Sequence, residues 1–164
     1  MVTTESQTPW HLRGNWAPVQ TELTADNLLV EGSIPPQLEG VYIRTGPNPK
    51  SGYSPHWFMG DGMVHGVRLS QGKAEWYRNR FVQTPNITKT VTGATPDLGD
   101  LSNGSGNTHV VTHAGKILCL EEGHWPWKID GELNTIGFEN YGGSLTTSMT
   151  AHPKICPETG ELLA

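Results

Sequence analysis

Glycine and proline interrupt this chain so often that it cannot form long helices. There are 20 glycines and 12 prolines among 164 residues, whereas proteins on average contain about 7% and 5% of these two residues. No window of a dozen residues carries apolar side chains at helical spacing without one of them breaking it. Short apolar and polar alternations separated by turns are frequent instead. This pattern predicts an all-β fold of the sandwich, barrel or propeller type.

The strongest strand predictions are two hairpins, because each consists of two alternating runs joined by a short turn that contains glycine. The predicted hairpins pair residues 63–69 with 74–82 and residues 108–114 with 117–122; single strands are predicted at 41–45 and 145–152, and one more begins at Glu161.

Residues 83–107 differ from the rest, since they are rich in Thr, Gly and Asn and contain few large apolar side chains. A loop of this length inside a compact domain is uncommon and is often functional. Two interpretations stay open: a surface excursion, or a loop that lines or covers a ligand.

The charge balance argues against a nucleic-acid-binding protein. With 11 basic and 16 acidic residues the formal net charge is −5, whereas such proteins usually carry a basic patch. No apolar run is long enough for a transmembrane helix, and the first residues do not resemble a secretory signal. The two cysteines, Cys119 and Cys156, do not form a disulfide framework. We therefore predict a cytoplasmic location and no nucleic-acid partner.

Among the seven histidines, His152 is the strongest candidate metal ligand. It ends the predicted strand at 145–152 on its polar face, and Pro153 restricts its backbone. His109 and His113 are four residues apart, but in a strand this spacing separates them by roughly 13 Å, too far to share one ion. For His56, His65 and His124, packing or hydrogen bonding within turns is the better interpretation.

Two adjacent carboxylates, Glu121 and Glu122, end another predicted strand. Neighbouring side chains of a strand point to opposite faces, so these two do not form a catalytic pair. Glu122 continues the face of Leu118 and Leu120 and is predicted to face inward, where a carboxylate needs a partner. A metal-bound imidazole would suit it; a backbone amide or an arginine is the alternative.

Taken together, seven segments in order along the chain resemble the carotenoid cleavage oxygenase family, which includes the lignostilbene dioxygenases. They cover most of residues 14–161. The segments read GNWAPV from Gly14, EGSIPP from Glu31, GVYIRTGPNP from Gly40, HWFMGDGMVH from His56, NTHVV from Asn107, LCLEEG from Leu118, and TAHPK from Thr150 with TGE from Thr159.

This resemblance implies a seven-bladed β-propeller with a non-haem Fe(II) on its axis, held by four histidines, three of them backed by glutamates. His152 matches the first iron ligand, and Glu122 matches the first of the backing glutamates, which in the family orients a later histidine. The implied reaction is O₂-dependent cleavage of a conjugated carbon–carbon double bond in a small apolar substrate. Neutral imidazoles suit Fe(II) and leave positions open for O₂.

We therefore predict that residues 1–164 form a single incomplete domain, the N-terminal part of such a propeller, with the other three ligands beyond Ala164. Three alternatives remain: an isomerase or hydrolase of the same family, a propeller scaffold without iron, and an inactive truncated product. Peripheral membrane contact is an open interpretation, although no amphipathic helix supports it. The sequence does not indicate the substrate, the bond that is cleaved or the oligomeric state.

Overall fold

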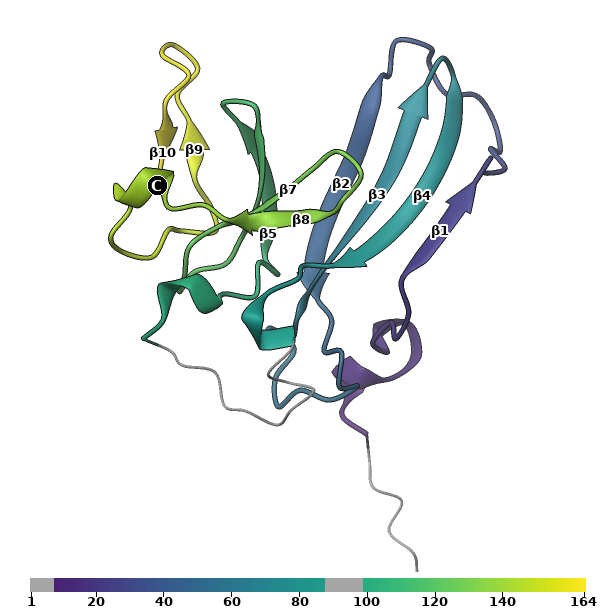
Figure 1. The fold of residues 1–164 in the computed structure, drawn as a ribbon. Helices are drawn as coiled ribbons and strands as arrows, with labels where there is room; N and C mark the ends of the chain where they lie inside the picture. Colours follow the sequence, from purple (N-terminus) through teal and green to yellow (C-terminus); the bar gives the residue numbers. More distant parts are fainter. Residues whose placement is uncertain (1–7, 88–98) are drawn as a thin grey trace, which may run out of the picture.

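The computed structural model describes residues 8–87 and 99–164. Within these ranges the chain forms two four-stranded antiparallel sheets and a short two-stranded hairpin (Figure 1). The helical segments in them are short: residues 85–87 and four 3-10 turns, η1 (Trp10–Leu12), η2 (Gly14–Trp16), η3 (Leu101–Asn103) and η4 (Tyr141–Gly143). None of the described helices is long and apolar enough to cross a membrane. Much of the predicted loop at 83–107 lies outside the described residues.

The first sheet has the order β1-β4-β3-β2. Its central pair is the predicted hairpin, and its turn is formed by Gln71 and Gly72, which both have positive φ values, 49° and 77°. Such a two-residue turn matches the right-handed twist of the strands that it joins. The four strands are β1 (Leu23–Asp26), β2 (Gly40–Pro47), β3 (Gly62–Ser70) and β4 (Lys73–Phe81).

The outer strand of this sheet comes from a distant part of the chain. β1 pairs with β4, and Leu23 lies opposite Asn79, 56 residues later. The Asn79 side chain accepts a hydrogen bond from Leu23 N and donates to the carbonyl of Thr21. A buried amide of β4 therefore fixes the start of β1.

The second sheet has the order β5-β6-β7-β8. Its first two strands form the other predicted hairpin, joined by Ala114 and Gly115 with φ values of 48° and 73°. Both predicted hairpins are thus confirmed. The strands are β5 (His109–His113), β6 (Lys116–Leu120), β7 (Trp127–Ile129) and β8 (Thr135–Phe138).

The two sheets pack against each other, as Figure 1 shows. The core between them consists of Val64, Trp76, Val82, Cys119, Trp127, Ile129 and Leu133. Backbones approach closely at Gly62, where an added Cβ would collide with the carbonyl oxygen of Ser105. Strand β2 of the first sheet and strand β5 of the second sheet are neighbours in this packing. This contact brings the ends of both sheets to one pocket.

The last hairpin consists of β9 (Lys154–Ile155) and β10 (Leu162–Leu163). The segment before it, residues 144–153, is not a strand, so the predicted strand at 145–152 is wrong. Its backbone bonds to turns and side chains rather than to a neighbouring strand: Met149 N donates to the carbonyl of His124 and Ala151 N to the carboxylate of Glu122. Met149 and Ala151 pack on Leu118 and Leu120 of β6, which holds the segment in place.

Candidate metal-binding site

His152 lies at the edge of a cavity of about 620 Å³. The cavity is built where β2, the start of β5, the turn after β6 and the segment before β9 meet. Its walls are formed by Thr45, Gly46, Pro47, Trp57, Phe58, Asn107, Thr108, Glu121, Glu122, Gly123 and His152. The two candidate residues of the sequence analysis, Glu122 and His152, thus share one pocket although they are 30 positions apart in the sequence.

The backbone next to His152 is firmly held, whereas its ring is accessible. Ala151 is fully buried; its N–H donates to Glu122 Oε2 at 3.2 Å, and its carbonyl accepts from His109 Nδ1 at 2.9 Å. The His152 side chain itself is 65% exposed and stacks on the ring of His109. This combination of a fixed backbone and an exposed imidazole suits a ligand.

Glu122 contacts three groups of the segment that carries His152. Its Oε1 lies 3.3 Å from His152 Nε2, and its Oε2 accepts from Ala151 N and, at 3.4 Å, from the Thr150 hydroxyl. The side chain is 59% exposed, so the prediction that Glu122 faces inward is wrong. The reason is that β6 ends at Leu120 and the chain then turns, so the alternation of a strand no longer applies.

Glu121 is the more buried of the two carboxylates, with 18% of its side chain exposed. It accepts hydrogen bonds from Gly123 N at 2.9 Å and from the Ser105 hydroxyl at 3.3 Å, and it pairs with His124. Sequence reasoning placed Glu121 on the opposite strand face and missed this pair. A spacing of three residues across a glycine in a turn was the available signal.

Each of the other six histidines uses one ring nitrogen in a hydrogen bond to another protein group. His109 and His113, which belong to the same strand, bond to the carbonyls of different residues. The partners are Ser54 O for His11, Phe58 N for His56, Tyr77 Oη for His65, Ala151 O for His109, Gly160 O for His113 and Glu121 for His124.

Burial and the nearby Arg44 guanidinium lower the pKa of His65 to about 4. Its imidazole is therefore neutral at pH 7, and its Nδ1 lies 2.8 Å from the Tyr77 hydroxyl. Burial likewise raises the pKa of the Cys119 thiol to about 12. Cys119 packs in the core between the two sheets and does not line the cavity beside His152.

The described residues contain no cluster of three or more His, Cys, Asp or Glu side chains that could hold a metal ion. Within the described residues His152 could thus supply only one donor, whereas metal sites need three or four. Its imidazole, which has a carboxylate beside it and a cavity in front of it, fits the role of one ligand to Fe(II).

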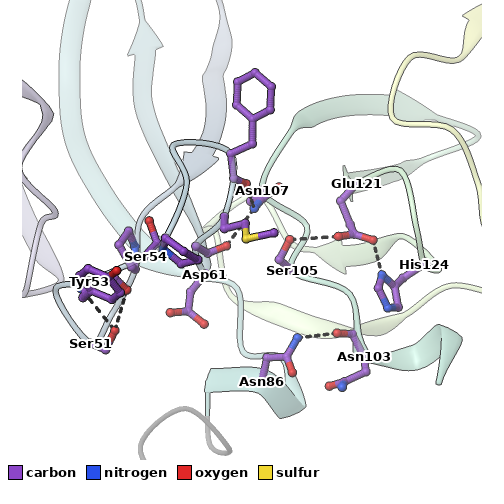
Figure 2. A pocket seen from close by; sticks show the side chains of 15 residues that line it. Ser51, Tyr53, Ser54, Asp61, Asn86, Asn103, Ser105, Asn107, Glu121 and His124 are labelled. Atoms are coloured by element: carbon purple, nitrogen blue, oxygen red, sulfur yellow. Dashed lines mark hydrogen bonds and ion pairs between the residues drawn. The ribbon is translucent and has the colours of Figure 1, made fainter. Parts of the chain in front are cut away.

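A second cavity of about 460 Å³ adjoins the first and shares the walls Phe58, Asn107 and Glu121. Figure 2 shows its polar lining, with Ser105, Glu121 and His124 connected in a row. Asn107 is buried between the two cavities; its amide donates to the carbonyls of Phe58 and Gly60 at 3.2 and 2.8 Å. Asn107 thereby fixes the loop at residues 58–60, whose Phe58 lines both cavities.

Comparisons with known proteins agree on one family. The model of the retinal pigment epithelial membrane protein family (RPE65) matches residues 16–164. A carotenoid cleavage oxygenase of Mycobacterium tuberculosis is 46% identical over 168 residues, which cover 98% of this chain and 33% of the relative. A carotenoid 9,10(9',10')-cleavage dioxygenase 1 of Arabidopsis thaliana is 39% identical over 196 residues, covering 96% of this chain and 36% of the relative.

Among solved structures, the lignostilbene dioxygenase of Pseudomonas brassicacearum matches with a TM-score of 0.81 and 31% identity, over 95% of this chain and 36% of that one. A cobalt-substituted apocarotenoid oxygenase of Synechocystis matches with a TM-score of 0.72 and 25% identity, over 87% of this chain and 35% of that one. The chain spans about a third of the length of these relatives.

These structures are seven-bladed β-propellers, which confirms the predicted fold class. The two four-stranded antiparallel sheets have the strand number of propeller blades. The chain belongs to the retinal pigment epithelial membrane protein family, the family of the carotenoid cleavage oxygenases.

Proposed function

We propose that the full-length protein containing this chain is an iron-dependent dioxygenase that cleaves a conjugated carbon–carbon double bond with O₂. The substrate class is that of the relatives: a carotenoid, an apocarotenoid or a stilbene. The observation that carries the proposal is the exposed ring of His152 on a fixed backbone, beside Glu122 and at the edge of a cavity of about 620 Å³.

In this proposal His152 holds the iron together with three histidines outside this chain. Fe(II), when bound, supplies the activation of O₂ that a side chain alone cannot provide. Glu122 holds Ala151 N and so fixes the backbone that carries His152; as the resemblance implies, its carboxylate would also orient one of the later histidines. Carboxylates that contact ligating histidines commonly have this effect.

The cavity walls suit a flat apolar substrate. Trp57 and Phe58 form an aromatic wall with ring centroids 5.9 Å apart, and Pro47 closes it from β2. Aromatic faces pack well on a conjugated chain or ring. Asn107 holds this wall in place through the carbonyls of Phe58 and Gly60. We infer that the aromatic wall binds the substrate while His152 faces the reacting bond.

Oxygen labelling separates this proposal from its alternatives. The full-length protein, loaded with Fe(II), is given a carotenoid or stilbene under ¹⁸O₂, and the products are analysed by mass spectrometry. We expect two carbonyl products that carry label, and none from the His152→Ala variant. An unlabelled product of unchanged mass would establish an isomerase, label from H₂¹⁸O alone would indicate a hydrolase, and no turnover with no bound iron would favour a scaffold.

The cytoplasmic location and the peripheral membrane contact stay predictions, as does the assignment of residues 1–164 to a single incomplete domain. Separating the cell extract into soluble and membrane fractions, with the protein detected in each, tests the first two together. Washing the membrane fraction with high salt or carbonate releases a peripheral protein.

A further inference from the structure

The turn after β6 has a side-chain pair that the proposed reaction does not use. Glu121 and His124 contact each other through Oε1 and Nδ1, and Figure 2 shows them facing one another across the turn. Both side chains are largely buried, with 18% and 13% exposed. Glu121 is also bonded to Gly123 N and to the Ser105 hydroxyl, so three bonds fix the shape of the turn.

The pair packs tightly on the neighbouring loop. An added Cβ at Gly104 would lie 2.6 Å from His124 Cβ and 3.4 Å from Glu121 Cγ. The carbonyl of Gly104 accepts a hydrogen bond from the indole of Trp127 at 2.9 Å. The turn therefore rests on backbone that is itself anchored in the second sheet, and it has little freedom to shift.

The same turn is hydrogen-bonded to the segment that carries His152 at two points. His124 O accepts from Met149 N at 3.3 Å, and Glu122 Oε2 accepts from Ala151 N at 3.2 Å. No neighbouring strand holds this segment, because residues 144–153 are irregular. The position of His152 consequently depends on the shape of the turn at residues 121–124.

We propose that Glu121 and His124 form a positioning pair that sets the place of the His152 ring relative to the metal. Glu121 lines the proposed substrate cavity, whereas His124 does not; the pair acts on the ligand through the backbone of His124 and the side chain of Glu122. This inference rests on the proposed function, since it takes His152 to be a ligand.

Substitutions that remove or keep the hydrogen bond test the proposal in the full-length protein. Glu121→Gln replaces a carboxylate oxygen by an amide at the pair, and His124→Leu removes the donor. His124→Asn keeps an N–H donor near the position of Nδ1. Asp130→Asn is the matched control, because Asp130 fastens the β7–β8 turn through Glu132 N and Asn134 N at 2.9 and 2.8 Å, away from residues 144–153.

The readouts are the Co(II) dissociation constant of the metal-free protein, the visible d–d spectrum of its Co(II) form, and the Tm. Cobalt is a suitable probe because a Synechocystis relative accepts it. We expect Glu121→Gln and His124→Leu to weaken Co(II) binding about tenfold, at the low end of effects of groups around a ligand, and to alter the d–d bands. We expect His124→Asn and Asp130→Asn to stay within about twofold of the wild type.

The control separates positioning from stability alone. If Glu121→Gln and Asp130→Asn lower the Tm alike while both keep the wild-type Co(II) affinity and spectrum, the pair is merely structural and the proposal fails. If His124→Leu does not fold, Glu121→Gln and His124→Asn still decide. If the wild-type protein binds no Co(II), the proposed function fails first, and this inference falls with it.

Discussion

The imidazole of His152 stacks on that of His109, with ring centroids 6.2 Å apart and ring planes 23° apart. His109 also donates to the carbonyl of Ala151 at 2.9 Å. In the full-length protein, His109→Ala should weaken Co(II) binding about fivefold, because one hydrogen bond that fixes the ligand's backbone, worth about 1 kcal/mol, is lost. Equilibrium dialysis measures the change. His113→Ala on the same strand is the control, since His113 bonds to Gly160 instead; equal losses would contradict the prediction.

His152→Ala should abolish turnover and most bound iron in the full-length protein while leaving its fold intact. Loss of one of the few ligands opens the site, whereas truncation of a side chain that is 65% exposed removes little packing. Iron content, turnover and circular dichroism check the three parts. A variant with stoichiometric iron and normal turnover would show that His152 is not a ligand.

Glu122→Gln should lower iron affinity or activity by ~10–100-fold, the usual effect of replacing a carboxylate beside a ligating histidine. The structure adds a physical reason, because Glu122 Oε2 accepts from Ala151 N as well as facing His152. Glu132→Gln serves as the control, since Glu132 forms an exposed pair with Arg78. Iron titration of both variants decides, and a Glu122→Gln protein with wild-type affinity would rule out the assigned role.

The free energy of unfolding of the full-length protein should depend on pH through His65. Its pKa is lowered to about 4 by burial and by Arg44, while an unfolded chain binds the proton near pH 6.5. Between pH 4 and 6.5 the unfolded state therefore binds more protons than the folded state. The stability that neutral His65 contributes is fully present above about pH 6.5 and is lost as the pH falls toward 4. The Tm difference between wild type and His65→Gln should shrink over that range. A difference independent of pH would contradict the assignment.

Residues 1–164 expressed alone should not form a well-folded monomer. Tyr42, Leu23 and Ile136 lie in strands at the edges of the two sheets and are 66%, 52% and 60% exposed. Unpaired sheet edges invite association. Size-exclusion chromatography and thermal unfolding measure the outcome. A monomeric elution volume together with a cooperative transition would refute this expectation.

The hairpins could be predicted from the sequence because their information is local. The turns at Gln71–Gly72 and Ala114–Gly115 carry glycine at a position with positive φ, flanked by alternating residues. Strands β7 and β8 were missed, since Trp127–Ile129 and Thr135–Phe138 are too short to show a clear period. β1 was missed as well, because its partner lies far along the chain.

The site could be predicted in part. The motif around His152 and Glu122 identified both residues, and the structure brings them within 3.3 Å. Their surroundings could not be predicted, because they depend on where β6 ends. That boundary exposes Glu122 and buries Glu121 beside His124. Residues 144–153 form no strand although their side chains alternate.

The pairing of β1 with β4 determines the order in which the first blade is assembled. Leu23 leaves the ribosome 56 residues before its partner Asn79, a delay of several seconds at a synthesis rate of roughly 5–20 residues per second. During that time β2, β3 and the β3–β4 turn are complete, but the outer edge of the blade is open. Within this sheet, the strand that comes earliest in the chain is thus the last to be incorporated, and Leu23–Asp26 stay unpaired until Phe81 has emerged.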